Sequence, residues 1–243
     1  MNDLTRDDFL GGRVSVYQPA KGYRAGVDPV LLAAACPAKA GQEVLELGCG
    51  VGVASLCLAQ RTQAQVLGVE RQGFYAGLAR RNGLEVVDAD LTHLPRDLRQ
   101  RSFDHVIANP PYYERGTHKA SADEGRAEAL GEDTPQAAWI EAASRRLKPK
   151  GYLTLIQRAD RLHHVLSACE GRLGSLQVLP LVPREGRDAS LIVLRARKEG
   201  RAPFRLHAPV VMHEGAVHGA DASDYTPELV NILQNGAALN FPH

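Results

Sequence analysis

Seven short apolar runs recur along the chain from about residue 40. They occupy 44–47, 64–69, 85–89, 105–108, 152–156, 176–182 and 190–196. Stretches with helical patterning separate the first several of them, and these lie at 52–61, 73–82 and 134–147. Apolar runs of strand length that alternate with amphipathic helices are typical of a doubly wound parallel sheet. The pattern therefore predicts an α/β fold with five parallel strands in its first part.

The last two apolar runs differ from the others because only the segment PREGRDA separates them. A crossover between parallel strands needs a longer connection, whereas an antiparallel pair does not. The final two strands are thus expected to form an antiparallel hairpin.

Segments with a different pattern flank this alternating unit. We expect 1–40 to be an N-terminal extension that packs on the ligand site, 41–196 to be the main domain, and 197–243 to be a C-terminal extension on the same domain. In the first extension, Asp28 precedes Pro29 and is expected to cap a short helix that ends near residue 36.

The C-terminal extension is rich in Arg, His, Pro and Gly. It predicts a strand at about 204–212 and a short helix after Thr226-Pro227. In the main domain, Thr134-Pro135 has the same form and is expected to begin the helix at 134–147.

Composition narrows the class of protein. Hydrophobic residues make up 44% and charged residues 23% of the chain, and the net charge is +1, so nucleic-acid binding would have to come from a local basic patch. The four cysteines form no C-x-x-C pair and are expected to be reduced thiols: Cys36, Cys49, Cys57 and Cys169. No apolar run approaches the roughly 18 residues of a membrane span, and the N-terminus has no signal-peptide core. These features predict a cytoplasmic protein with no membrane association and no evident obligate protein partner.

The segment ELGCGVG, residues 46–52, is the first candidate for chemistry. It follows an apolar run and opens a helix, and its glycines permit a tight turn and a close approach of a ligand to the backbone. The spacing of Gly48, Gly50 and Gly52 is G-x-G-x-G, which differs from the G-x-G-x-x-G of the dinucleotide fingerprint. A nucleoside that carries an amino acid instead of phosphates fits this difference, and Glu46 would suit its ammonium group.

Two further carboxylates stand at predicted strand ends. Glu70 follows the second run, where an acidic residue accepts hydrogen bonds from a ribose diol in both NAD and S-adenosylmethionine sites. Asp90 follows the third run and can accept from an adenine amino group. Asp88 is the alternative candidate for the adenine contact, since strand alternation puts both side chains on one face. Asp90 is preferred because it lies at the strand tip, where ligands bind in open α/β sheets.

The segment Asn-Pro-Pro-Tyr at 109–112 follows the fourth run. The prolines fix the backbone, so the Asn109 side chain and the Pro110 carbonyl can accept both hydrogens of a planar amino group. Such a pair keeps the nitrogen lone pair directed at an electrophile and needs no strong general base. Tyr112 can stack on the flat system that bears the amine.

In this order and spacing, ELGCGVG, Glu70, Asp90 and Asn-Pro-Pro-Tyr resemble the class I S-adenosylmethionine-dependent methyltransferases, in the branch that methylates amino groups. The resemblance covers 40–196 and implies a Rossmann-like seven-stranded sheet with helices on both faces and a terminal antiparallel hairpin. It implies these roles: Gly48, Gly50 and Gly52 line S-adenosylmethionine, Glu70 holds its ribose, Asp90 contacts its adenine, Arg24 and Asp28 lie near its methionine end, and Asn109, Pro110 and Tyr112 hold the target.

A narrower resemblance extends over nearly the whole chain. The stretches QPAKGYRAGVDPVLLAAA (18–35), VPREGRDASLIVLRARKEGRAP (182–203) and DYTPE (224–228), with the motif at 109–112, are similar to the valine-tRNA adenine-N6 methyltransferase family. This family modifies the adenine next to the anticodon, so the resemblance implies a tRNA substrate.

Other interpretations remain open from the sequence. One is methylation of another amine, either guanine N2 in ribosomal RNA or a protein glutamine; another is a non-catalytic cofactor- or RNA-binding protein. The loop 113–131 carries basic residues that would suit a lid or a phosphate clamp for an extruded base: Arg115, His118, Lys119 and Arg126. His213-Glu214…His218 has one residue too many for H-E-x-x-H, so no metal site is expected.

Overall fold

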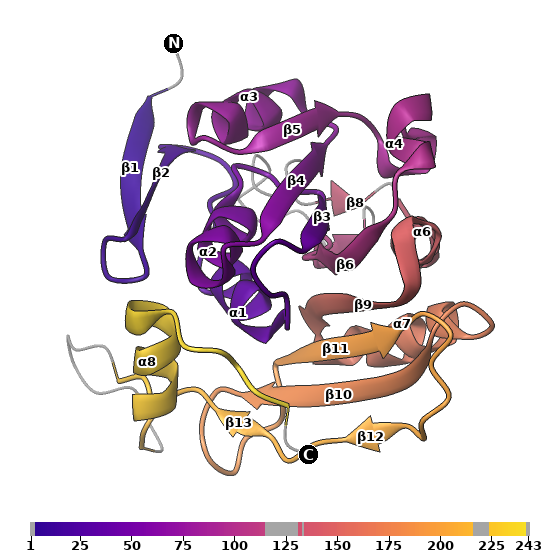
Figure 1. Ribbon diagram of the computed structural model, residues 1–243. Helices are drawn as coiled ribbons and strands as arrows, with labels where there is room; N and C mark the ends of the chain where they lie inside the picture. Colours follow the sequence, from indigo (N-terminus) through magenta and orange to yellow (C-terminus); the bar gives the residue numbers. More distant parts are fainter. Residues whose placement is uncertain (1–2, 115–130, 133, 216–223, 242–243) are drawn as a thin grey trace.

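The computed structural model describes residues 3–114, 131–132, 134–215 and 224–241 (Figure 1). The four basic residues of the 113–131 loop, and His218, lie outside these ranges. At the edges of that loop, β7 (Tyr113–Glu114) pairs in parallel with β8 (Gly131–Glu132). No helix in the described ranges is long and apolar enough to cross a membrane. Nor do the residues described there include a group of three or more His, Cys, Asp or Glu side chains that could hold a metal ion.

One large mixed sheet forms the centre of the described chain. Its order is β12-β10-β11-β9-β6-β3-β4-β5, and β13 also pairs with β10. The main strands are β3 (Glu43–Leu47), β4 (Gln65–Glu70), β5 (Glu85–Asp88), β6 (Phe103–Ala108), β9 (Leu147–Arg158), β10 (Gly174–Val182) and β11 (Leu191–Arg197). The first five are parallel, and β11 lies antiparallel between β9 and β10. This confirms the predicted seven-stranded sheet with its terminal hairpin.

Two short strands extend the sheet beyond the seven predicted ones. β12 (Arg205–Leu206) and β13 (Val210–Val211) both pair in parallel with β10. The single strand expected at about 204–212 is therefore interrupted. Pro209 lies in the interruption and has no backbone N–H to donate to a ladder.

Helices cover both faces of the sheet, as the alternating pattern predicts (Figure 1). One apolar cluster includes residues of α1 (Asp28–Ala35), α2 (Val53–Thr62), α3 (Gly73–Arg81) and α8 (Pro227–Asn235). A second cluster includes α4 (Arg96–Gln100), α6 (Gln136–Arg146) and α7 (Leu162–Cys169). The short 3₁₀ helices are η1 (Leu91–His93) and η2 (Ala159–Arg161). Burial of both faces explains why the central strands are almost uniformly apolar.

Neither of the two helix caps predicted from the sequence, Asp28 and Thr134, is found. Asp28 is the first residue of α1 rather than its cap, and its side chain makes no cap hydrogen bond. α6 begins at Gln136, after Pro135, and Thr134 does not cap it. Thr226 does cap α8, since its Oγ1 accepts from the Leu229 N–H at 3.4 Å.

The N-terminal extension contains an antiparallel hairpin that the apolar pattern did not predict. β1 (Leu4–Phe9) and β2 (Val14–Pro19) are joined by a turn in which Gly11 and Gly12 have φ of 64° and 86°. A Gly-Gly pair between strand-length runs is a hairpin signal. The sequence LTRDDF of β1 is mostly polar, and this obscured it. The proposed boundaries of the two extensions remain predictions.

Asn82, just after α3, attaches this hairpin to the main domain. Its Oδ1 accepts from the Tyr17 N–H at 2.8 Å, and its Nδ2 donates to the carbonyls of Tyr17 at 3.1 Å and Val51 at 3.0 Å. The guanidinium of Arg81 also lies over the Tyr17 ring, 4.1 Å from its centroid. One amide side chain thus connects β2, α3 and the turn that precedes α2.

Replacing Asn82 with alanine should destabilise the protein by about 1–3 kcal/mol, because three backbone groups lose their partner. Urea unfolding measures the change. Asn235→Ala is the matched control, since Asn235 is exposed and, among the described residues, its side-chain amide bonds only to Asn231 one turn earlier. Equal effects of the two substitutions would contradict the role given to Asn82.

Candidate cofactor and substrate cavity

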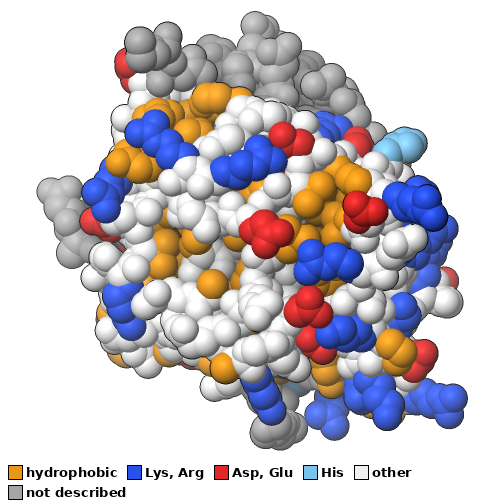
Figure 2. Space-filling model, turned by 45° about the horizontal axis from the view of Figure 1, so that its top comes forward, with side chains coloured by type: hydrophobic (Ala, Val, Ile, Leu, Met, Phe, Trp, Pro, Cys, Tyr) orange, Lys and Arg blue, Asp and Glu red, His pale blue; other side chains and the backbone are white. Residues whose placement is uncertain are grey.

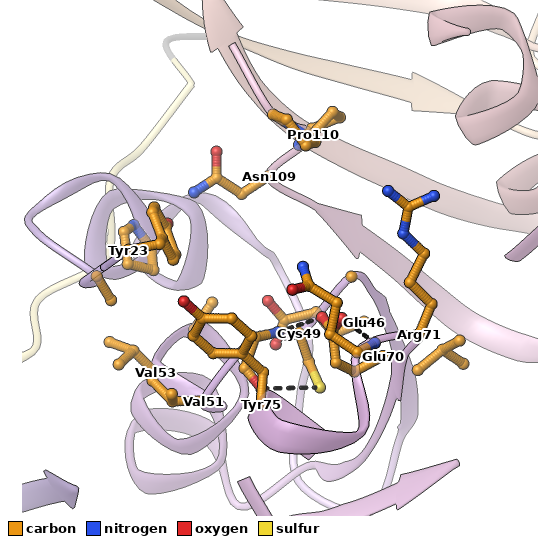
Figure 3. A pocket seen from close by; sticks show the side chains of 18 of the residues that line it. Tyr23, Glu46, Cys49, Val51, Val53, Glu70, Arg71, Tyr75, Asn109 and Pro110 are labelled. Carbon is orange, nitrogen blue, oxygen red and sulfur yellow. Dashed lines mark hydrogen bonds between the residues drawn. The ribbon is translucent and has the colours of Figure 1, made fainter. Parts of the chain in front are cut away.

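A cavity of about 430 Å³ opens at the carboxyl ends of β3, β4, β5 and β6 (Figure 3). This is the edge at which ligands bind in open α/β sheets, and the volume is within the usual range for small-molecule sites. Most of the predicted site residues line it: Arg24, Asp28, Glu46, Gly48, Gly50, Glu70, Asp90, Asn109, Pro110 and Tyr112. Folding therefore brings together residues that are spread over nearly ninety positions of the sequence.

The glycines of the turn after β3 are required for different reasons. All three have left-handed φ values, 66° at Gly48, 55° at Gly50 and 93° at Gly52. A Cβ at Gly48 would lie 2.6 Å from the Trp139 ring, whereas a Cβ at Gly50 would meet nothing within 4 Å. Gly52 does not line the cavity; it precedes α2, and a Cβ there would meet Leu84 at 3.0 Å. Of the three glycines in this turn, Gly48 and Gly50 line the cavity, and packing against Leu84 accounts for Gly52.

Glu70, at the end of β4, is buried and bonded to backbone. Its Oε2 accepts from the Gly50 N–H at 3.0 Å and its Oε1 from the Gln72 N–H at 2.8 Å. These bonds fix the carboxylate between the glycine turn and the start of α3. Each oxygen keeps a second lone pair for a ligand hydroxyl.

The structure distinguishes Asp90 from Asp88. Asp88 pairs with Arg80 at 2.8 Å and is not among the cavity-lining residues. Asp90 lines the cavity and accepts from the Thr92 N–H at 2.8 Å and the Thr92 Oγ1 at 2.6 Å. The Thr92 hydrogen bonds hold the pKa of Asp90 below its usual value, so the carboxylate stays ionised.

Glu46 is the most deeply buried carboxyl group of the cavity, with 2% of its surface exposed. Its Oε2 accepts from the N–H and the Oγ of Ser55 on α2. Burial, with a smaller contribution from the nearby Glu70, raises the pKa of Glu46 to about 8, against the opposing effect of the Ser55 hydrogen bonds. A cation bound in the cavity would offset the free-energy cost of ionising this buried carboxyl group.

Asn109 and Pro110 face the cavity from the side opposite Glu46, Glu70 and Tyr75 (Figure 3). They follow β6 directly, so the strand sets their position. The Oδ1 of Asn109 is buried and has no hydrogen-bond partner among the described residues. A buried acceptor without a partner is costly unless a ligand supplies the donor.

Tyr112 is anchored by the N-terminal segment. Its hydroxyl donates to the Oδ2 of Asp28, the first residue of α1. Burial raises the pKa of both groups; in Asp28 the bond from Tyr112 opposes the rise, and in Tyr112 the Asp28 charge adds to it. The hydroxyl is therefore unsuited to act as a base, and the contact instead fixes the ring orientation.

Three aromatic residues of the lining were not predicted as site residues from the sequence: Tyr23, Tyr75 and Trp139. Tyr23 and Tyr75 meet edge to face, with ring centroids 6.5 Å apart, and burial raises the pKa of Tyr23 to about 12. Their positions in a loop and on helices carried no local signal. Arg24 lines the cavity as expected, but its guanidinium pairs with Asp7 of β1 at 2.6 Å.

The fold and this cavity define a class I S-adenosylmethionine-dependent methyltransferase. The chain belongs to the methyltransferase small domain family, whose model matches residues 25–179. Its cofactor is S-adenosylmethionine. The cavity suits that molecule, because acidic side chains line it and S-adenosylmethionine carries sulfonium and ammonium charges.

Relatives and solved structures agree with this assignment. A tRNA1(Val) (adenine(37)-N6)-methyltransferase of Shewanella baltica is 30% identical over 185 residues, which cover 71% of this chain and 76% of the relative. One from Haemophilus influenzae is also 30% identical, over 61% of this chain and 67% of its own.

Two solved structures are also similar to this chain. A predicted O-methyltransferase of Agrobacterium tumefaciens has a TM-score of 0.69 at 30% identity, covering 87% of this chain and 97% of that one. A 16S rRNA N2 G1207 methyltransferase of T. Thermophilus, in complex with AdoMet and guanosine, has a TM-score of 0.55 at 25% identity, covering 83% of this chain and 46% of the other.

Gly48→Ala should destabilise the protein by about 1–3 kcal/mol more than Gly50→Ala. Both substitutions place a side chain at a left-handed φ, so that cost cancels, and only the first forces the Trp139 ring to move. Urea unfolding without cofactor measures the difference. Equal destabilisation would show that Trp139 yields freely.

Glu46→Gln should change how stability depends on pH. The unfolded chain ionises Glu46 near 4.5 and the folded protein near 8, so the folded state retains a proton between these values. The contribution of Glu46 to stability is therefore complete below about pH 4.5 and is lost as pH rises through about 8.

Thermal unfolding of the cofactor-free protein from pH 5 to pH 8 provides the test. The variant should gain stability relative to the wild type as pH rises across that window, and Glu85→Gln, at an exposed position, controls for lost charge. Parallel curves for Glu46→Gln and wild type would contradict the shifted pKa.

Proposed function

We propose that this protein transfers a methyl group from S-adenosylmethionine to N6 of an adenine in tRNA, namely the anticodon-loop adenine of valine tRNA. The observation that carries the chemical part is the buried, unpartnered Oδ1 of Asn109 beside the Pro110 backbone. The relatives named as tRNA1(Val) adenine-N6 methyltransferases support the choice of base and RNA.

Asn109 and Pro110 act by orientation. The amide oxygen of Asn109 and the carbonyl oxygen of Pro110 each accept one N–H of the exocyclic amine. Both hydrogens are then held in the base plane, and the nitrogen lone pair is available perpendicular to it. When bound, S-adenosylmethionine would supply an electrophilic methyl group: the C–N bond would form as the C–S bond breaks, S-adenosylhomocysteine would leave, and the proton released by the amine would pass to water.

Tyr112 supports the base by stacking. Its hydroxyl is held by Asp28, so the ring loses little freedom when a base binds against it. An adenine within a stacked loop cannot reach this cavity, so the base must leave the stack, as is usual for enzymes that modify bases. Asp28 thereby connects the N-terminal segment to the target-binding loop.

The surface is not strongly basic overall. The net charge is +1, and Figure 2 shows Lys and Arg side chains interspersed with Asp and Glu over much of one face, with more blue toward its right-hand margin. Contacts to the RNA backbone are therefore expected from local clusters and to weaken with salt.

The proposed function is tested by nucleoside mass spectrometry. The protein is incubated with S-adenosylmethionine and, in separate reactions, with a valine-tRNA transcript and with unmodified ribosomal RNA, and each digest is searched for methylated nucleosides. N6-methyladenosine should appear, and it should vanish when the adenine next to the anticodon is replaced by guanine. N2-methylguanosine made on ribosomal RNA, with no product on tRNA, would overturn the proposal in favour of the activity named for the T. Thermophilus structure.

Asn109→Ala should lower kcat by about 10²–10³, because it removes an acceptor that orients the attacking amine. Affinity for S-adenosylmethionine, measured by calorimetry, should change little. A variant with unchanged kcat would remove Asn109 from the reaction, and one that fails to bind cofactor would assign it to cofactor binding instead.

A further inference from the structure

A second cavity, of about 480 Å³, lies at the other end of the strands. Its lining comes from the amino ends of β3, β6 and β9, from β10, β11 and β12, and from the C-terminal segment: Gln42, Asp104, His105, Lys148, Lys150, Tyr152, Gln177, Arg195, Arg205 and Phe241 among others. The cofactor cavity lies at the carboxyl ends of the same sheet, so the two sites share none of their lining residues.

Strand register builds this second cavity from polar residues on one face of the sheet. Thr154 lies opposite Arg195, Arg195 opposite Gln177, and Gln177 opposite Arg205. In the neighbouring row His105 lies opposite Tyr152, and their rings stack with centroids 6.2 Å apart. Directly opposed residues share a face of the sheet. α1 packs with apolar contacts on this same face of the sheet. Toward the amino ends of β6 and β9, the face becomes polar.

Two buried polar atoms of the lining have no partner among the described residues. They are the Nδ1 of His105 and the Nε of Arg195. His105 is 5% exposed, and burial lowers its pKa to about 4, so its ring is neutral. The Oε1 of Gln42 accepts from the Lys39 N–H and lies 3.1 Å from His105 Nε2, so Nε2 carries the ring proton and Nδ1 is an acceptor.

The lining of this cavity is strongly basic. It includes five cationic side chains and one carboxylate: Lys39, Lys148, Lys150, Arg195 and Arg205, with Asp104. Lys148 pairs with Asp104 at 3.1 Å. Within the described ranges Lys150, Arg195 and Arg205 pair with no carboxylate, and Arg195 is held by a bond to the Ala35 carbonyl and by the Phe241 ring, 4.1 Å from its centroid. The guanidinium is thus fixed in place with its Nε unused.

We propose that this second cavity binds a phosphate-bearing ligand. A phosphate group offers several acceptor oxygens to Arg195, Arg205 and Lys150, which a guanidinium fork and an ammonium recognise well. A ribose hydroxyl or a protonated phosphate oxygen can donate to the Nδ1 of His105. The phosphate comes either from a free nucleotide or pyrophosphate, or from the backbone of the RNA substrate.

Titration calorimetry at about 150 mM salt tests the proposal, with the cofactor cavity saturated by S-adenosylhomocysteine so that no probe enters it. The probes are pyrophosphate, adenosine monophosphate and a short oligoribonucleotide. At least one should bind the wild type, and its affinity should fall at least about tenfold in Arg205→Glu and in Lys150→Glu. Arg201→Glu is the matched control, because Arg201 is exposed, close in sequence to β12, and not part of the lining.

Backbone amide NMR shifts then locate the ligand, with changes expected at Lys150, Gly151 and Tyr152. Binding of pyrophosphate or the mononucleotide supports a free phosphorylated ligand, and binding of the oligoribonucleotide alone assigns the phosphate to RNA. No binding of any probe would overturn the proposal. So would an equal loss in Arg201→Glu, or shifts confined to other parts of the protein.

Discussion

The close contact between Gly48 and Trp139 joins the glycine turn of the cofactor cavity to helix α6. Gly48 belongs to the turn after β3, and Trp139 belongs to α6 on the second face of the sheet. With no Cβ at Gly48, the indole ring lies directly against the backbone turn. The same turn carries Gly50, whose N–H donates to the carboxylate of Glu70. The packing of α6 against Gly48 therefore helps to fix the carboxylate of Glu70 at the cavity.

The sign of the lining charges distinguishes the cofactor cavity from the second cavity. The cofactor cavity is lined by Asp28, Glu46, Glu70 and Asp90, with Arg24 and Arg71 as its cations. Concentrating carboxylates in a confined space is unfavourable without a cation, and the raised pKa of Glu46 is one expression of that cost. At the opposite end of the same strands, cationic side chains outnumber carboxylates in the lining of the second cavity. A chain with almost no net charge therefore carries two sites of opposite sign, and the formal charge of +1 reveals neither.

Much of the fold followed from the apolar pattern, because buried parallel strands must be continuous apolar runs and strand ends must carry the polar site. Glu70, Asp90 and Asn109, which line the cofactor cavity, were predicted this way. The β1–β2 hairpin was not, since β1 is polar. Nor could the sequence show that Asp28 bonds to Tyr112 rather than capping α1, because that choice depends on a contact across 84 positions. The second cavity was equally hidden, as its rows of polar residues exist only once the strands are in register.

The two short strands near the C-terminus have a consequence for solubility. β10 would otherwise be the last strand of a large sheet, with a long row of free backbone N–H and carbonyl groups on its outer side. β12 and β13 occupy two stretches of that row, and Pro180 within β10 offers no donor. An uncovered strand edge is a template for pairing with another chain. The C-terminal segment thus protects the sheet against edge-to-edge self-association, whatever else it contributes.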